Sequence, residues 1–330
     1  MARDRLALAI LALAALPTVA AAYDDDSPYP SPTVPSVEAP RDLEVTPRLR
    51  TRVYVDQEWT QGAGLHNGPG SVDRARTTAT FGVESRVADA WILGLGARFD
   101  YFIYDFENPV AILGVNDRLL RFAHRVTAGP SATYIFNDRW RLTTRFSVGV
   151  ARENEASVAD SLTFGATAFI GWRIFENIRF NVGGTARFSR LFIDSGVPNL
   201  LPIAGFEWTG AESWGETQGI RGFGIGIGAD GAYVRMSLTD TTAVMLSARY
   251  ESQAFRLNRR NIVPEGIFSE QRVPVGVQFE WSPADGVYLV AHVDGIPWHR
   301  YDVRDKSGNR GNGVVADPTL AGGFGVAFNF

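Results

Sequence analysis

Arginines at alternate positions are the residues of this sequence whose type and spacing could do chemistry. In the run RLLRFAHRVT, Arg121 and Arg125 are four residues apart, so an extended strand places both on one face. Guanidinium groups bind carboxylates and phosphates through paired hydrogen bonds, and a wall of them favours anions. By the same alternation, the candidates for an anion path are Arg98, Arg121, Arg125, Arg141, Arg145, Arg173, Arg179 and Arg187.

Acidic residues on the same strand faces support a second interpretation. They are fewer than the arginines, although the whole chain has a net charge of −4. The main ones are Asp56, Glu58, Glu84, Asp100, Glu207, Glu251 and Glu280. Intramembrane charges usually pair with one another, and they also often mark a pathway. An anion path and a set of structural ion pairs therefore both remain open.

Catalytic and metal chemistry have weaker support. Asp294, His299 and Asp302 in DGIPWHRYD could activate water in a hydrolase, or they could form a polar rim where a strand ends. No nucleophile accompanies them, so we do not expect an enzyme. The chain has no cysteine and its four histidines lack metal-ligand spacing. We expect no metal, no cofactor and no nucleic-acid partner.

The pattern of the first 48 residues predicts an export signal followed by a spacer. Arg3 and Arg5, a short apolar stretch and a small-residue cleavage site predict that residues 1–22 are a cleaved secretory signal. Its apolar core is shorter than the roughly 20 residues that span a bilayer. Residues 23–48 contain five prolines between Pro28 and Pro40, which predicts an extended periplasmic segment.

From residue 49 to residue 330 the hydrophobic pattern has period two, which predicts strands rather than helices. Short connections alternate with long ones along this region. The short ones lie near 88–90, 137–138, 175–177, 210–213, 239–242 and 282–286, and the long ones near 60–74, 107–117, 152–160, 191–199, 225–230, 258–269 and 302–318. This layout predicts an all-β fold, a transmembrane antiparallel up-and-down β-barrel of about 14 strands, with 12 as the alternative.

The tryptophans fit a membrane barrel. Amphipathic rings settle at the two membrane interfaces and form girdles there. The tryptophans beside the short connections are Trp91, Trp140, Trp172, Trp208, Trp214 and Trp281, and we expect them to form the girdle on that side.

The chain ends on an apolar strand, GGFGVAFNF, in which Phe324, Val326, Phe328 and Phe330 share one face. This ending resembles the C-terminal signal of bacterial outer-membrane β-barrel proteins. The resemblance implies a location in the bacterial outer membrane, contact with its lipid, and the barrel-assembly machinery as a folding partner.

We therefore expect a monomeric, porin-like passive channel for small hydrophilic and preferentially anionic solutes. The alternative is a closed structural or surface-interaction barrel that acts through its extracellular loops, especially 60–74 and 302–318. An outer-membrane hydrolase is the third hypothesis.

Overall fold

The computed structural model describes residues 49–66, 70–113, 119–175, 178–189, 191, 199–209, 223–228, 231–239 and 241–330. The predicted signal (1–22), the proline-rich segment (23–48) and Trp214 lie outside these ranges. Within them, no helix is long and apolar enough to cross a membrane.

Strands form nearly all of the described fold, together with the short helices α2 (Val110–Leu113) and η2 (Ala159–Ser161). The strands are β1 (Leu49–Gly64), β2 (Ser71–Ala88), β3 (Trp91–Glu107), β4 (Phe122–Ile135), β5 (Trp140–Glu153), β6 (Leu162–Phe175), β7 (Ile178–Ser189), β8 (Asn199–Thr209), β9 (Phe223–Gly228), β10 (Gly231–Ser237), β11 (Thr242–Arg249), β12 (Glu251–Arg256), β13 (Ile267–Ala284), β14 (Val287–Arg304), β15 (Arg310–Ala316) and β16 (Thr319–Asn329).

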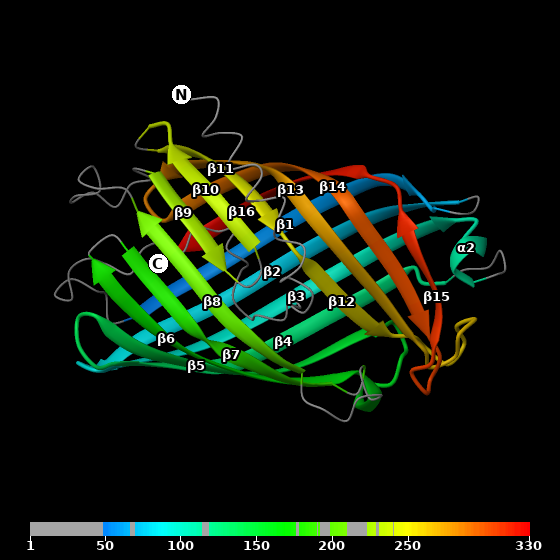
Figure 1. The fold of residues 1–330 in the computed structure, drawn as a ribbon, viewed down its shortest axis with the longest axis horizontal. Helices are drawn as coiled ribbons and strands as arrows, with labels where there is room; N and C mark the ends of the chain where they lie inside the picture. The colour runs from blue at the N-terminus through cyan, green and yellow to red at the C-terminus, as the bar shows by residue number, and fades with distance from the viewer. Residues whose placement is uncertain are drawn as a thin grey trace.

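These segments make one closed barrel of fourteen antiparallel wall strands (Figure 1). Two wall strands are each interrupted once. β11 and β12 are separated at Tyr250, and β15 and β16 are separated at Asp317 and Pro318, where proline removes a backbone donor. The prediction of an all-β barrel with fourteen strands is confirmed. One predicted connection is wrong, because residues 225–228 belong to β9 and pair with β8 and β10.

The last strand closes the barrel. β16 pairs with β1 from Arg52 opposite Asn329 to Thr60 opposite Ala321. The backbone of Phe330 continues the ladder through two hydrogen bonds with Thr51, of 2.8 and 3.0 Å. This pairing leaves no free edge where the first and last strands meet, which is the condition for a sheet in hydrocarbon. It explains why the sequence ends on an apolar strand.

The outer face is an apolar belt. Its exposed side chains include Val55, Phe81, Leu93, Leu95, Phe99, Phe146, Phe164, Ile170, Val182, Val275, Val277, Phe279, Leu289, Val293, Leu320 and Phe324. The belt ends near His124 and Arg152, where the Arg152 Nε donates to His124 Nε2 over 3.2 Å.

Aromatic residues mark the end of the barrel that carries the short connections, hereafter the turn end. Trp91, Trp140, Trp172 and Trp281 are exposed there, and Trp208 is half-buried near the end of β8. The rings of Trp140 and Trp172 stack with centroids 5.2 Å apart. This is the arrangement expected at a membrane interface.

The opposite end, hereafter the loop end, carries α2, β12 and β15 and lies at the right in Figure 1. Its interior is filled by one apolar cluster, which we call the plug. The plug comprises Ala63, Leu65, Val72, Phe102, Tyr104, Ile112, Leu119, Leu120, Ala123, Ala151, Leu191, Ala254, Phe255, Leu257, Ile267, Phe268, Tyr301, Val303, Val314 and Ala316. Its aromatic rings meet edge to face, as Tyr104 does with Phe268 at 5.3 Å.

Candidate lumen site

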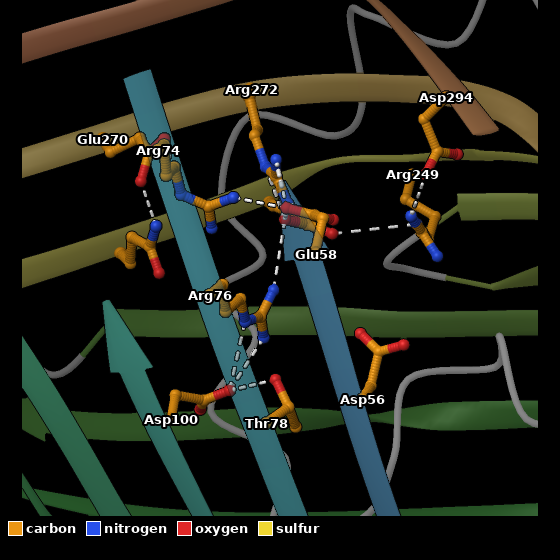
Figure 2. A network of polar contacts seen from close by, with 12 residues as sticks. Asp56, Glu58, Arg74, Arg76, Thr78, Asp100, Arg249, Glu270, Arg272 and Asp294 are labelled. Carbon is orange, nitrogen blue, oxygen red and sulfur yellow. Dashed lines mark hydrogen bonds and ion pairs between the residues drawn. The ribbon is translucent and has the colours of Figure 1, made fainter. Parts of the chain in front are cut away.

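A buried network of charges lies in the lumen beside the plug (Figure 2). We call it the charge network. It contains six arginines and six carboxylates, which are Arg74, Arg76, Arg98, Arg125, Arg249 and Arg272 with Asp56, Glu58, Asp100, Glu251, Glu270 and Asp294. Strand alternation points all of them inward. The arginines and carboxylates are equal in number, and His292 contacts Asp56 and Asp294 within the same network.

Asp100 on β3 is the centre of one half of the network. Its carboxylate is fully buried and accepts hydrogen bonds from Arg98 at 2.8 Å, Arg125 at 2.8 Å and Arg76 at 3.1 Å. The hydroxyl of Thr78 donates a further bond of 2.7 Å. Three guanidinium groups on one carboxylate fix the positions of β2, β3 and β4 relative to one another.

Glu58 on β1 is the centre of the other half. Arg74 approaches it at 2.5 Å and Arg272 at 2.8 Å, and Arg272 also contacts Glu251 on β12. Arg76 reaches Glu251 over 3.5 Å and so joins the two halves. These contacts connect β1 and β2 with β12 and β13 through side chains, in addition to the backbone ladder.

The network meets the plug at Glu270, which Arg74 links to Glu58. Glu270 accepts a hydrogen bond from the Tyr104 hydroxyl at 2.6 Å and contacts His299 Nε2 at 2.7 Å. Gln253 on β12 donates to the same carboxylate. His299 is completely buried, so solvent does not reach it.

The three residues considered for hydrolysis do not converge. Asp302 lies on the opposite face of β14 from His299 and pairs with Arg300 at 3.0 Å. Asp294 contacts His292 at 2.8 Å instead. Strand alternation and the irregular register of β14 near Gly295 separate them. This arrangement cannot activate a water molecule for hydrolysis.

Glu58, His292 and Asp294 bring ligand atoms within 4.8 Å of one another, the geometry of a cation site. Arginine side chains already lie beside two of these groups. Glu58 faces Arg74 and Arg272, and Arg249 lies 3.4 Å from Asp294. Guanidinium groups thus supply the positive charge that a metal ion would supply, and we assign no metal centre here.

A second group of arginines lines the barrel away from the network. We call it the arginine arc. It consists of Arg141 and Arg145 on β5, Arg173 on β6, and Arg179 and Arg187 on β7, all half-buried. Among the described residues of these three strands, the only inward acid is Glu153, at the loop end of β5. The Arg145 guanidinium lies 5.6 Å from the centroid of the Phe169 ring.

The register within the arc places like charges together. Arg173 lies directly opposite Arg179 on neighbouring strands, and Arg173 also donates to the carbonyl of Asp138 in the adjoining turn. Gly171 lies between Arg141 and Asn181, and a Cβ there would come within 2.9 Å of the Arg141 Nε. The missing side chain gives the guanidinium its space over the strand.

The eight arginines predicted from parity thus fall into three groups. Arg98 and Arg125 face the lumen but are buried against Asp100. Arg141, Arg145, Arg173, Arg179 and Arg187 make the arc. The lumen placement of Arg121 is wrong, because Arg121 precedes β4 and its exposed side chain lies 4.9 Å from the Phe122 ring.

The plug is the feature that the sequence analysis missed. A signal for it was present, since Phe102 and Tyr104 have the same parity as the inward Asp100, and Phe255 and Phe268 have inward parity too. Aromatic residues at inward positions near strand ends indicate a filled lumen rather than an open one.

Barrel closure, the apolar outer belt and the polar inner face are sufficient to place the architecture. The chain folds as a closed antiparallel β-barrel with an apolar outer belt, the architecture of a barrel that spans a membrane. No family model matches its sequence, and no curated protein does.

Several solved structures resemble the barrel distantly. An outer-membrane channel from Pseudomonas putida F1 has 10% sequence identity and a TM-score of 0.44, over 89% of this chain and 100% of that one. The P. putida toluene transporter TodX has 7% identity and a TM-score of 0.43, over 88% and 92%. The KdgM porin, solved with oligogalacturonate, has 9% identity and a TM-score of 0.35, over 84% and 99%. These similarities are too distant to transfer a function to this chain.

Proposed function

We propose that the protein is a passive channel of the outer membrane for small hydrophilic solutes, with a preference for anions. Residues 1–22 are removed on export in this proposal. The observation that carries it is the arginine arc, in which five inward arginines lie on three neighbouring strands, whereas the described acids beside them in the register are Glu153 at the loop end of β5 and Glu207 of β8, opposite Arg179. A wall of one charge beside a low-dielectric barrel raises the local concentration of the opposite ion.

The charge network does not account for the preference, because its six arginines and six carboxylates balance. Removing Arg125, for example, would leave a buried carboxylate with fewer partners. This would change the stability of the fold more than the electric field in the lumen. The arc is the part of the lumen where charge can be changed with little cost in packing, since its side chains are only half-buried.

The test is single-channel current of the refolded, signal-free protein in a planar bilayer under a potassium chloride gradient. We expect an anion-selective reversal potential in the unaltered protein. The triple variant Arg145→Gln, Arg179→Gln, Arg187→Gln should bring the chloride-to-potassium permeability ratio toward one. Arg121→Gln is the control for the loss of a single arginine outside the arc, because its exposed side chain lies against Phe122.

Two outcomes would contradict this proposal. An unchanged reversal potential in the triple variant would mean that the arc does not set selectivity. The absence of channel current from correctly folded protein in every variant would favour the second candidate, a closed surface-interaction barrel. The plug is the specific observation in favour of that candidate, because it fills the loop end.

A further inference from the structure

Strand β12 leaves the barrel wall. β11 pairs with β10 as far as Arg249 opposite Gly231. Beyond Tyr250, β12 keeps its pairing with β13 but pairs no further with β10, and its last residue, Arg256, forms a parallel bridge with Arg152 of β5. Five strands, β6 to β10, separate β5 from β11 at the turn end. At the loop end, β12 meets β5 directly.

The contact between β12 and β5 is weaker than the other strand contacts of the loop end. β12 and β13 share six paired positions, from Glu251 opposite Arg272 to Arg256 opposite Ile267. One bridge joins β12 to β5. Because each backbone pairing adds only about 1 kcal/mol, this seam is the place where the ring separates most easily.

A few side chains fasten the seam. The Arg256 guanidinium donates to the carbonyl of Asp160 over 3.3 Å, just before β6. The carboxylate of Glu153, at the end of β5, accepts from the Asn258 backbone N–H at 2.8 Å and from the Asn261 amide at 3.1 Å. The partners Asp160, Glu153, Asn258 and Asn261 are half-buried at the rim, whereas Arg256 is buried.

β12 also supplies the centre of the plug. Phe255 is completely buried and its ring meets the Phe102 ring edge to face at 5.0 Å. Leu257, which follows the strand, is completely buried as well. On the network side, Gln253 donates to Glu270. If β12 moves away from β5, Phe255 and Leu257 leave the lumen with it.

We propose that β12 is the gate of the channel, a strap that closes the loop end when it bridges to β5 and opens it when the bridge separates. The inference rests on the proposed channel function. Tyr250, where the strand is interrupted, is the hinge at one end, and the segment from Asn258 to Gly266 gives slack at the other. β12 moves as a hairpin with β13, to which it stays paired.

The chain has no cysteine, so a disulfide can lock the strap without background. Ala151 and Phe255 both belong to the plug, so Arg152 and Arg256 share the opposite face of their strands. Neighbouring strands lie about 4.8 Å apart, within the Cα separation of about 4.4–6.8 Å that a disulfide needs. The locked variant is Arg152→Cys with Arg256→Cys.

The matched control joins β12 to β13 instead. Ser252 lies opposite Gln271, so Ser252→Cys with Gln271→Cys makes a cross-link that moves with the hairpin. The single variants Arg152→Cys and Arg256→Cys separate the effect of the bond from the loss of each arginine. Disulfide formation is read from gel mobility before and after reduction, and current is recorded in a planar bilayer in both states.

We expect the oxidised Arg152–Arg256 variant to stay shut and to recover its current on reduction, while the control conducts in both states. Phe255→Ala, which keeps the strap and empties the plug, should raise the open probability and gives a second test if the disulfide variant does not fold. Equal current from the verified cross-link in both states would overturn the gate and leave the channel function standing. No current from any variant would overturn the channel function itself.

Discussion

At the scale of single residues, the lumen arginines have two different roles. Arg76, Arg98 and Arg125 converge on Asp100, where the four side chains are buried and hydrogen-bonded. The arc arginines lie on strands whose other inward positions are threonine, glycine, serine and asparagine, with Phe169, Ala151 and the loop-end Glu153 as the exceptions. Structural pairing is thus the role of the first group, and anion attraction is the role that we propose for the arc.

Asp100→Asn should be strongly destabilising. The change leaves three buried guanidinium groups with no carboxylate between them, and breaking a buried pair costs about 3–5 kcal/mol. The measurement is the free energy of unfolding by denaturant in detergent or lipid. Asp105→Asn removes a charge from an exposed position five residues along the same strand and should change the free energy by less than about 0.5 kcal/mol. Equal effects of the two changes would mean that the network is not a structural centre.

Glu153 predicts a pH dependence at the rim. Burial raises the pKa of this carboxyl above its ordinary value, although Asn258 and Asn261 donate to it. The folded state therefore holds this proton more tightly than the unfolded state does. The contribution of Glu153 then favours folding at low pH and is lost as pH rises through the folded pKa.

Glu153→Gln keeps an acceptor oxygen and removes the charge. We expect its thermal midpoint to equal or exceed that of the unaltered protein at about pH 8, with a flatter profile down to about pH 4. Glu155→Gln is the control, because Glu155 is exposed and carries the same charge. A lower midpoint for Glu153→Gln at about pH 8 would show that the charged form stabilises the rim.

At the scale of elements, β16 and β12 are the two strands whose pairing decides the state of the barrel. β16 joins β1 and β14 and so closes the sheet. In the wall strand made of β11 and β12, β11 pairs with β10 whereas β12 bridges to β5, and this bridge closes the loop end. In the first case a full ladder of antiparallel pairs makes the closure permanent, and in the second a single bridge makes it reversible.

Phe330 tests the predicted role of the last strand in assembly. Its ring is 74% exposed and only its backbone pairs with Thr51, so Phe330→Ala removes no buried contact. We expect unchanged stability after refolding in detergent, but several-fold less folded protein in the outer membrane of living cells. Phe279→Ala, also an exposed ring on the outer face, should not reduce assembly. Equal yields from the two variants would argue against an assembly signal at the C-terminus.

At the scale of the whole molecule, two surfaces of opposite character share one wall. The outer belt is apolar along the wall strands whose side chains the structure describes, while the inner face carries the charge network and the arc. The barrel is also asymmetric along its axis, with the plug at the loop end and aromatic rings on the outer surface of the turn end. This asymmetry fits a passage that is selected by charge in one half and closed in the other.

The position of the membrane can be read from paired substitutions of equal exposure. Leu95 is 51% exposed within β3, four residues from the interface residue Trp91, and Leu238 is 53% exposed beside a turn-end connection. An arginine at the bilayer midplane costs about 2–4 kcal/mol, and near the interface it costs about 0–1 kcal/mol. Leu95→Arg should therefore lower the free energy of unfolding in lipid vesicles much more than Leu238→Arg. Equal costs would place the belt elsewhere.

The sequence alone determined the fold class, the strand count and the closing strand. These properties depend on local alternation and on connection length, which a single strand and its neighbours specify. It also separated inward from outward residues well enough to find seven of the eight candidate arginines on inward strand positions, with Arg121 the exception.

Only the tertiary structure decided which arginines are paired and how the loop end is closed. Asp100 and its three arginines come from neighbouring strands, but Arg272 reaches Glu58 across 214 positions of sequence. The same holds for β12, whose pairing with β5 joins residues 104 positions apart. The alternation of residues predicts which face of a strand a side chain lies on. The depth of that side chain in the lumen and its partner on the other strands depend on the register, the bulges and the closure of the whole barrel.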